Sequence, residues 1–144
     1  NTLDKKFKDI SIPKNLHFMG FVSYNKVTKI LPKYKILLMP YQNKVGVLIE
    51  GIDVSKYFSP LKLFEYMASG RPIIASNLKV YRNILKHNYN SILLKQDNIT
   101  DWTIAIKKIM FKKNYSYLGK NARNDAKNYS WKLRAQKIIK FYEK

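Results

Sequence analysis

SPLKLFEYMASGRPIIA, residues 59–75, contains a helix signal followed directly by a strand signal. Pro60 suits the first position of a helix, where its fixed φ fits and no N–H is needed, and Ser59 can cap the free amides. Gly70 is typical of a helix end, and the apolar run Pro72–Ala75 predicts a buried strand. A helix that leads into a fully apolar strand is typical of a parallel sheet covered on both faces.

The same alternation extends through the rest of the chain. Further apolar runs predict strands at Leu16–Met19, Ile36–Met39 and Ser91–Leu94. Caps and breakers predict helices over residues 24–31, 78–85, 99–111, 115–127 and 130–142, a long loop over 41–58 and a turn over 88–90. The predicted fold is therefore α/β, a Rossmann-like parallel sheet with helices on both faces, followed by C-terminal helices.

Length and ends suggest a piece of a larger protein. The chain has 144 residues, which is the size of one ordinary domain, and it opens at Asn1 rather than at Met. A parallel sheet that starts in the middle of a unit would leave an unpaired edge. We interpret residues 1–144 as a single partial domain, with 1–15 as the remnant of an upstream unit and 130–144 as a closing helix.

Composition excludes several classes of site. There is no cysteine, which excludes disulfides, zinc–thiolate sites and a cysteine nucleophile. The two histidines, His17 and His87, are too few for a histidine-rich metal cage, so we expect no metal site. We interpret His17 as a packed residue of a strand and His87 as a residue at a helix end. No apolar run reaches the roughly 20 residues that a membrane-spanning helix needs.

The chain is strongly basic, with 28 Lys and Arg against 9 Asp and Glu and a net charge of +19. Such a charge is compatible with a nucleic-acid-binding or a peripheral membrane module, and both stay open as alternatives. Only four of the basic residues are Arg, whereas a dedicated nucleic-acid surface favours the planar Arg fork. The last predicted helix carries an apolar side with Trp131 and Ile138, which core packing or a membrane surface would explain.

The helix over residues 60–69 is expected to present one apolar and one polar side. We predict that the side packing on the sheet is formed by Leu61, Phe64 and Ala68, flanked by Leu63 and Met67. The opposite side carries Lys62, Glu65, Tyr66 and Ser69. Glu65 then lies one turn inside the helix and points toward the crevice beyond the strand ends, where open α/β sheets bind ligands. The free amides at the helix start suit an anion such as phosphate.

Several of these motifs together resemble one family. Phe18–Val22, Ile36–Tyr41, Ser59–Gly70 and Pro72–Ser76 follow one another as in the donor-binding domain of retaining GT-B glycosyltransferases, group 1 (family 4). Tyr129-Ser130-Trp131 and the helix after it resemble the end of that domain, and the resemblance runs from Leu16 to the C-terminus. It implies an enzyme that transfers sugar from a nucleotide-sugar, in bacterial polysaccharide or glycolipid assembly. It also implies a cytoplasmic location, or one at the inner face of the membrane.

The resemblance also implies residue roles. Glu65 matches the second Glu of the family's E-x7-E motif, which holds the ribose hydroxyls. The diphosphate would lie at the helix start, at Ser59, Leu61 and Lys62, and the nucleobase would lie against residues 20–22. These last residues are Gly20, Phe21 and Val22.

The catalytic position departs from the family's pattern. The first Glu of the motif is replaced by Tyr57, and Asp53 is an alternative source of the missing carboxylate. The resemblance implies no required cofactor, a UDP-, GDP- or ADP-sugar as donor, and an acceptor domain that is absent from this chain. We therefore predict that the chain alone binds nucleotide weakly and does not transfer sugar.

Overall fold

The computed structural model describes residues 13–42 and 61–143, so residues 43–58 of the predicted loop, with Asp53 and Tyr57, and also Ser59 lie outside the described residues. Its helices are α2 (Tyr24–Ile30), α3 (Leu61–Ser69), α4 (Ile99–Phe111), α5 (Ser116–Ala126) and α6 (Trp131–Tyr142). The strands are β1 (Leu37–Met39), β2 (Ile73–Ser76) and β3 (Ile92–Leu94). Short 3-10 helices occur at η1 (Leu31–Lys33), η2 (Lys79–Tyr81), η3 (Lys113–Tyr115) and η4 (Lys127–Tyr129).

The strands form a parallel sheet in the order β1-β2-β3. Leu37 is aligned with Ile73, and Ile74 with Ile92. Every residue of β2 is buried, as expected for the central strand of a sheet that is covered on both faces. The predicted parallel α/β architecture is confirmed, with three strands in the described residues.

The predicted strand at Leu16–Met19 is wrong. These residues have no regular structure, and Leu16, Phe18 and Met19 are about half exposed. His17 is exposed as well, so it is not the packed histidine that the sequence suggested. An apolar run becomes a strand only beside another strand, because its backbone hydrogen bonds come from a neighbouring segment. In the described residues, no strand pairs with this run.

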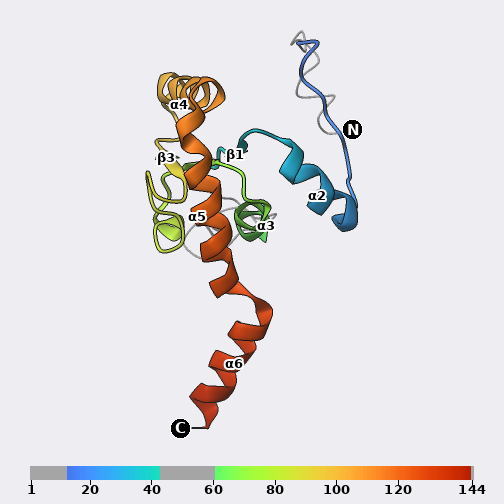
Figure 1. Ribbon diagram of the computed structural model, residues 1–144, viewed down its shortest axis with the longest axis vertical. Helices are drawn as coiled ribbons and strands as arrows, with labels where there is room; N and C mark the ends of the chain where they lie inside the picture. Colours follow the sequence, from blue (N-terminus) through green and yellow to red (C-terminus); the bar gives the residue numbers. More distant parts are fainter. Residues whose placement is uncertain (1–12, 43–60, 144) are drawn as a thin grey trace, which may run out of the picture.

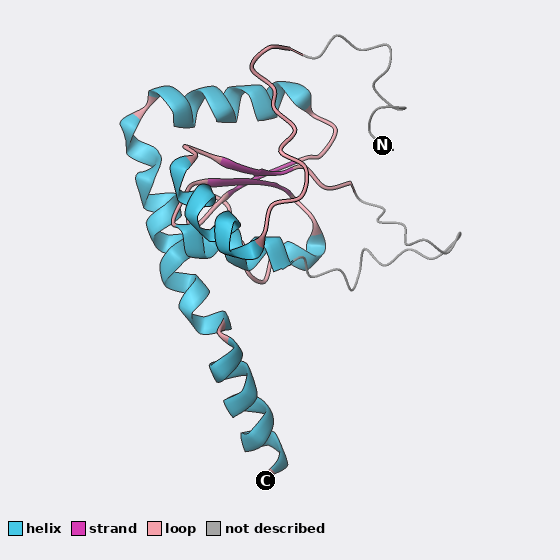
Figure 2. Ribbon diagram, turned by 90° about the vertical axis from the view of Figure 1, so that its right-hand side faces the viewer, coloured by secondary structure: helices cyan, strands magenta, loops and turns pink. Residues whose placement is uncertain are grey.

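Helices cover both faces of the sheet, as predicted. On one face Leu63 and Met67 of α3 pack with Met39, Ile73 and Ala75. On the other face Trp102 of α4 packs with Ile74 and Ile92. Figure 2 shows the strands enclosed between these two helical layers. Helix α5 joins the layers, because its Leu118 belongs to the second cluster and its Ala122 to the first.

Two glycines let α5 approach the end of α3. Gly70 follows α3 with a φ of +72°, a left-handed conformation that favours glycine. A Cβ added at Gly119 of α5 would collide with the carbonyl oxygen of Gly70 and would lie 3.0 Å from the carbonyl carbon of Arg71. The two elements are therefore in backbone contact.

The predicted helix over residues 78–85 is reduced to η2 and a series of turns. The side chain of Asn90 explains why the helix does not continue. Its Oδ1 accepts from the backbone N–H of Lys86 at 2.7 Å, and its Nδ2 donates to the carbonyl of Ile84 at 3.0 Å. These side-chain bonds occupy backbone groups that a longer helix would use.

The three C-terminal helices lie within one residue of their predicted positions. Asn98 caps α4 by accepting from the N–H of Asp101 at 3.1 Å, and Ser130 caps α6 by accepting from the N–H of Leu133 at 3.3 Å. Helix α6 has no buried residue, and Figure 1 shows it extending away from the sheet.

Candidate functional site

The sheet topology places the start of α3 at the edge where the parallel strands end. Because α3 connects β1 to the neighbouring parallel strand β2, it runs back antiparallel to both. Its first residue, Leu61, is therefore at the same edge as Met39 and Ser76, the last residues of these strands. The amides of its first turn are directed to this edge, which is the ligand-binding edge of open α/β sheets.

The buried side of α3 is centred on Leu63 and Met67, both 0% exposed. The predicted centre at Leu61, Phe64 and Ala68 is therefore wrong, since Leu61 is 69% exposed and Ala68 is exposed. The difference arises because α3 packs on α5 as well as on the sheet. The apolar pattern alone did not reveal the second neighbour.

Glu65 lies on the side of α3 opposite Leu63 and Met67, because it is two residues from each along a helix of 3.6 residues per turn. Its side chain is half-buried and that of Lys62 is exposed. Within the described residues these two side chains form no ion pair with one another. Neither side chain is therefore occupied by the i, i+3 ion pair that their spacing on the helix allows.

Tyrosine side chains surround this part of α3, and the sequence reasoning missed their role. Burial raises the pKa of Tyr66, and the nearby Tyr41 and Glu65 raise it further. Burial, with a smaller contribution from Tyr41, raises the pKa of Tyr81 to about 12. The rings of Tyr41 and Tyr81 meet edge to face at 6.4 Å between centroids. Tyr66 was assigned to the polar side of the helix, yet it packs against the core with Tyr41.

Two buried hydroxyls, those of Ser76 and Tyr81, have no hydrogen-bond partner in the described part of the chain. Ser76 is the last residue of β2, and Tyr81 belongs to η2, which follows that strand. The sequence could have indicated that these polar groups lie at the strand-end edge, because Tyr41 and Ser76 come at or just after the ends of two predicted strands. The edge thus combines helix amides, one carboxylate and phenol and hydroxyl groups, which suits a polar ligand with an anionic part.

Gly20, Phe21 and Val22, expected against the nucleobase, form a largely exposed segment. Gly20 has a φ of +61°, Phe21 is 97% exposed and the segment precedes α2. Figure 1 shows the start of α2 on the side of that helix farther from β1. Of the site residues expected from sequence, the described ones at the strand-end edge are Leu61, Lys62 and Glu65.

Residues 13–42 and 61–143 contain no group of three or more His, Asp or Glu side chains able to hold a metal ion. None of the helices described here has both the length and the apolar character to cross a membrane.

Curated relatives share moderate identity with the chain. A UDP-Gal:alpha-D-GlcNAc-diphosphoundecaprenol alpha-1,3-galactosyltransferase of Escherichia coli is 25% identical over 130 residues, or 86% of this chain and 34% of that protein. The putative teichuronic acid biosynthesis glycosyltransferase TuaH of Bacillus subtilis is 23% identical, over 96% of this chain and 32% of its own length. The chain thus spans about a third of the length of these relatives.

Solved structures share the fold. Sucrose-phosphate synthase from Thermosynechococcus elongatus superposes with a TM-score of 0.74 at 18% identity, over 99% of this chain and 32% of that one. Anabaena HepE, solved in complex with UDP-glucose, superposes with a TM-score of 0.68 at 14% identity, over 99% of this chain and 36% of that one. These neighbours are GT-B glycosyltransferases. The family model for glycosyl transferases group 1 matches residues 1–125, and the chain therefore belongs to the group 1 glycosyltransferases.

Proposed function

We propose that the chain is the donor-binding domain of a retaining glycosyltransferase of family 4 and that it binds a nucleotide-sugar. Membership of the group 1 family supports sugar transfer. The Escherichia coli relative is named for a UDP-galactose donor, and HepE was solved with UDP-glucose. Both names favour a uridine nucleotide among the UDP-, GDP- and ADP-sugars that we consider.

One observation carries the proposal: Glu65 lies on the side of α3 opposite Leu63 and Met67, close to the ends of the parallel strands. A carboxylate there can accept hydrogen bonds from both hydroxyls of a ribose cis-diol. The diphosphate then lies at residues 59–62, where the free amides and the helix dipole attract an anion and Lys62 adds a positive charge.

Transfer itself requires groups beyond this chain. In the proposed reaction the sugar leaves the diphosphate and joins an acceptor held by a second domain, and closure of the two domains aligns the reactants. The helix start and Lys62 stabilise the charge that develops on the leaving diphosphate, with no metal or other cofactor required. Tyr57, or Asp53 in its place, contacts the donor sugar. The acceptor belongs to bacterial polysaccharide or glycolipid assembly, and the chain alone is inactive.

Calorimetric titration with UDP, GDP, ADP and their sugars tests the donor role. We expect one diphosphate nucleotide to saturate one site and Glu65→Gln to weaken it about tenfold, the loss of a hydrogen-bonded charged group. Glu143→Gln, at the exposed end of α6, is the matched control and should bind as the parent does. Equal weakening by both variants, or no saturable nucleotide binding, would contradict the proposal.

Peripheral membrane association is a second candidate, favoured by α6. This helix exposes Trp131, Ile138 and Phe141, and it also carries Lys132, Lys137 and Lys140. Such a helix suits an anionic membrane surface, at the inner face of the cytoplasmic membrane. Sedimentation with anionic vesicles tests it, and Phe141→Asp should reduce binding while leaving nucleotide affinity unchanged. A short DNA in the same series tests binding by charge alone, which should fall steeply with salt.

A further inference from the structure

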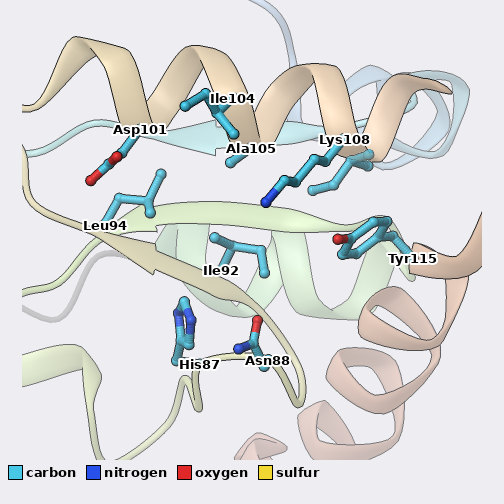
Figure 3. Close-up of a pocket in the computed structure, with 10 residues that line it drawn as sticks. His87, Asn88, Ile92, Leu94, Asp101, Ile104, Ala105, Lys108 and Tyr115 are labelled. Atoms are coloured by element: carbon cyan, nitrogen blue, oxygen red, sulfur yellow. The ribbon is translucent and has the colours of Figure 1, made fainter. Parts of the chain in front are cut away.

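A groove lies on the face of the sheet opposite α3, between α4 and the edge strand β3 (Figure 3). Its volume is about 360 Å³, within the range of pockets that hold small molecules. Because α4 is on the other side of the sheet from α3, the groove is separate from the proposed donor site.

The middle of the groove is apolar. Ile92 and Leu94 of β3 form its floor, and Ile104, Ala105 and Ile109 of α4 form its roof. Ile104 is 45% exposed, so part of this surface is available to a ligand. Along α4 the lining extends from Asp101 to Ile109, which is about 12 Å at a rise of about 1.5 Å per residue.

Hydrogen-bond donors gather at one end of the groove. Lys108 and Tyr115 line this end, and Figure 3 shows the Lys108 side chain extending over Ile92. Neither the ammonium nor the phenol has a hydrogen-bond or ionic partner in the described residues. Two unpaired donors that face the same space favour an acceptor with negative charge.

His87 also lines the groove, and its hydrogen-bonding role differs from the helix-end dipole interaction expected from sequence. Its Nδ1 accepts from the N–H of Leu93 at 3.0 Å. The proton of the neutral imidazole is therefore on Nε2, which donates. Figure 3 shows His87 on the other side of β3 from Lys108, so it lines the outer edge of the groove and not the end formed by Lys108 and Tyr115.

The opposite end disfavours a second anion. Asp101 lines it, and its carboxylate accepts from the Nδ2 of Asn98 at 2.7 Å within the cap of α4. The two ends of the groove therefore differ: hydrogen-bond donors lie at one end, apolar side chains in the middle and a carboxylate at the other end.

We propose that this groove binds a small amphipathic anion, with its charged head at Lys108 and Tyr115 and a medium-length alkyl body along Ile92 and Ile104. The charge of Lys108 and the phenol of Tyr115 select the head, and burial of the alkyl body against the floor and roof supplies the apolar part of the affinity. Asp101 at the far end selects against a molecule with two anionic ends.

The test uses octanoate and octyl phosphate as probes, titrated below their micellar range into the whole 144-residue chain by calorimetry. Octanol and propionate lack the charge and the alkyl body, respectively. We expect either octyl anion to saturate one site, neither control to do so, and saturating UDP-sugar to leave the affinity unchanged. The two octyl anions distinguish a carboxylate from a phosphate head.

Variants locate the site. Lys108→Met should weaken binding at least about tenfold, whereas Lys107→Met, the neighbouring exposed lysine that does not line the groove, should leave it unchanged. Ala105→Leu should block binding by filling the groove, with thermal melts to verify folding; if it unfolds, Lys108→Met decides alone. No saturation by either octyl anion, equal effects of the two lysine variants, or competition with UDP-sugar would overturn the proposal.

Discussion

Helices α5 and α6 follow one another in the chain, yet their surroundings differ completely. Helix α5 buries Leu118, Gly119 and Ala122 between the two helical layers. Helix α6 buries nothing, although its apolar residues are larger, and Trp131 is 74% exposed. The link between them is anchored by the ring of Tyr129 in η4, which lies 5.2 Å from the ring of Phe64 of α3.

The difference teaches that the packing of a helix depends on how closely its neighbour can approach. Gly119 brings the backbone of α5 against Gly70, and the larger side chains nearby then reach both cores. The apolar side of α6 is not covered by any residue that the structure describes. Substitutions in α5 should therefore change global stability, and those in α6 should not.

The largest effect is expected from Leu118→Ala. Leu118 is 0% exposed beside Trp102, so its truncation should lower the free energy of unfolding by about 3 kcal/mol, the typical cost of a core cavity. Ile138→Ala, on the half-exposed surface of α6, should cost less than about 1 kcal/mol. Urea unfolding followed by circular dichroism measures both, and similar costs would show that α6 is packed in solution.

A smaller loss is expected from Gly119→Ala. The new methyl group would collide with the backbone of Gly70, which cannot move without displacing the end of α3, and overpacking of this kind costs about 2 kcal/mol. Ala135→Leu is the counterpart on the exposed surface of α6 and should stay within about 0.5 kcal/mol of the parent. An unchanged urea midpoint for Gly119→Ala would show that α3 and α5 are not in backbone contact.

The helix caps sharpen the comparison further. Asn98→Ala removes the cap of α4, a helix packed through Trp102, and should lower global stability by about 1 kcal/mol. Ser130→Ala removes the equivalent cap of α6. Because α6 does not pack on the core, we expect its amides to exchange faster with an unchanged urea midpoint. A lowered midpoint for Ser130→Ala would contradict the independence of α6.

The smallest effect at neutral pH is expected from Tyr81→Phe, in the core that Ala122 of α5 helps to form. The variant removes a buried hydroxyl that has no partner in the described chain, so stability should be unchanged or slightly higher. Folding raises the pKa of Tyr81 from about 10 to about 12. The contribution of the neutral phenol to folding stability is therefore complete below pH 10 and is lost as the pH rises toward 12.

Tyr81→Phe should therefore lose less stability than the parent between pH 10 and 12. The variant should still lose some stability over this range, because the pKa of Tyr66 is also raised by folding. Urea unfolding at pH 8, 10 and 11 measures the difference. Equal losses in the two proteins would show that Tyr81 ionises equally well in the folded and unfolded chain.

Features that depend on neighbours along the chain were predictable. The bounds of α4 were predicted to the residue because its cap and its apolar spacing lie within the helix itself. The orientation of Glu65 away from the core follows in the same way from helical periodicity. The hydroxyls of Ser76 and Tyr81 were missed, because their burial depends on segments that are distant in sequence.

The sequence by itself determined helices α2 to α6 and the alternation that produces a parallel sheet, since helical hydrogen bonds join residues only four positions apart. Only the tertiary structure decided which apolar segments acquired partners. Leu16–Met19 remained exposed, and α6 remained uncovered. The Nδ1 of His87 accepts a hydrogen bond from the N–H of Leu93 in the edge strand β3. Strand pairing and side-chain burial require contact between distant segments, and an apolar run does not specify which segment it will meet.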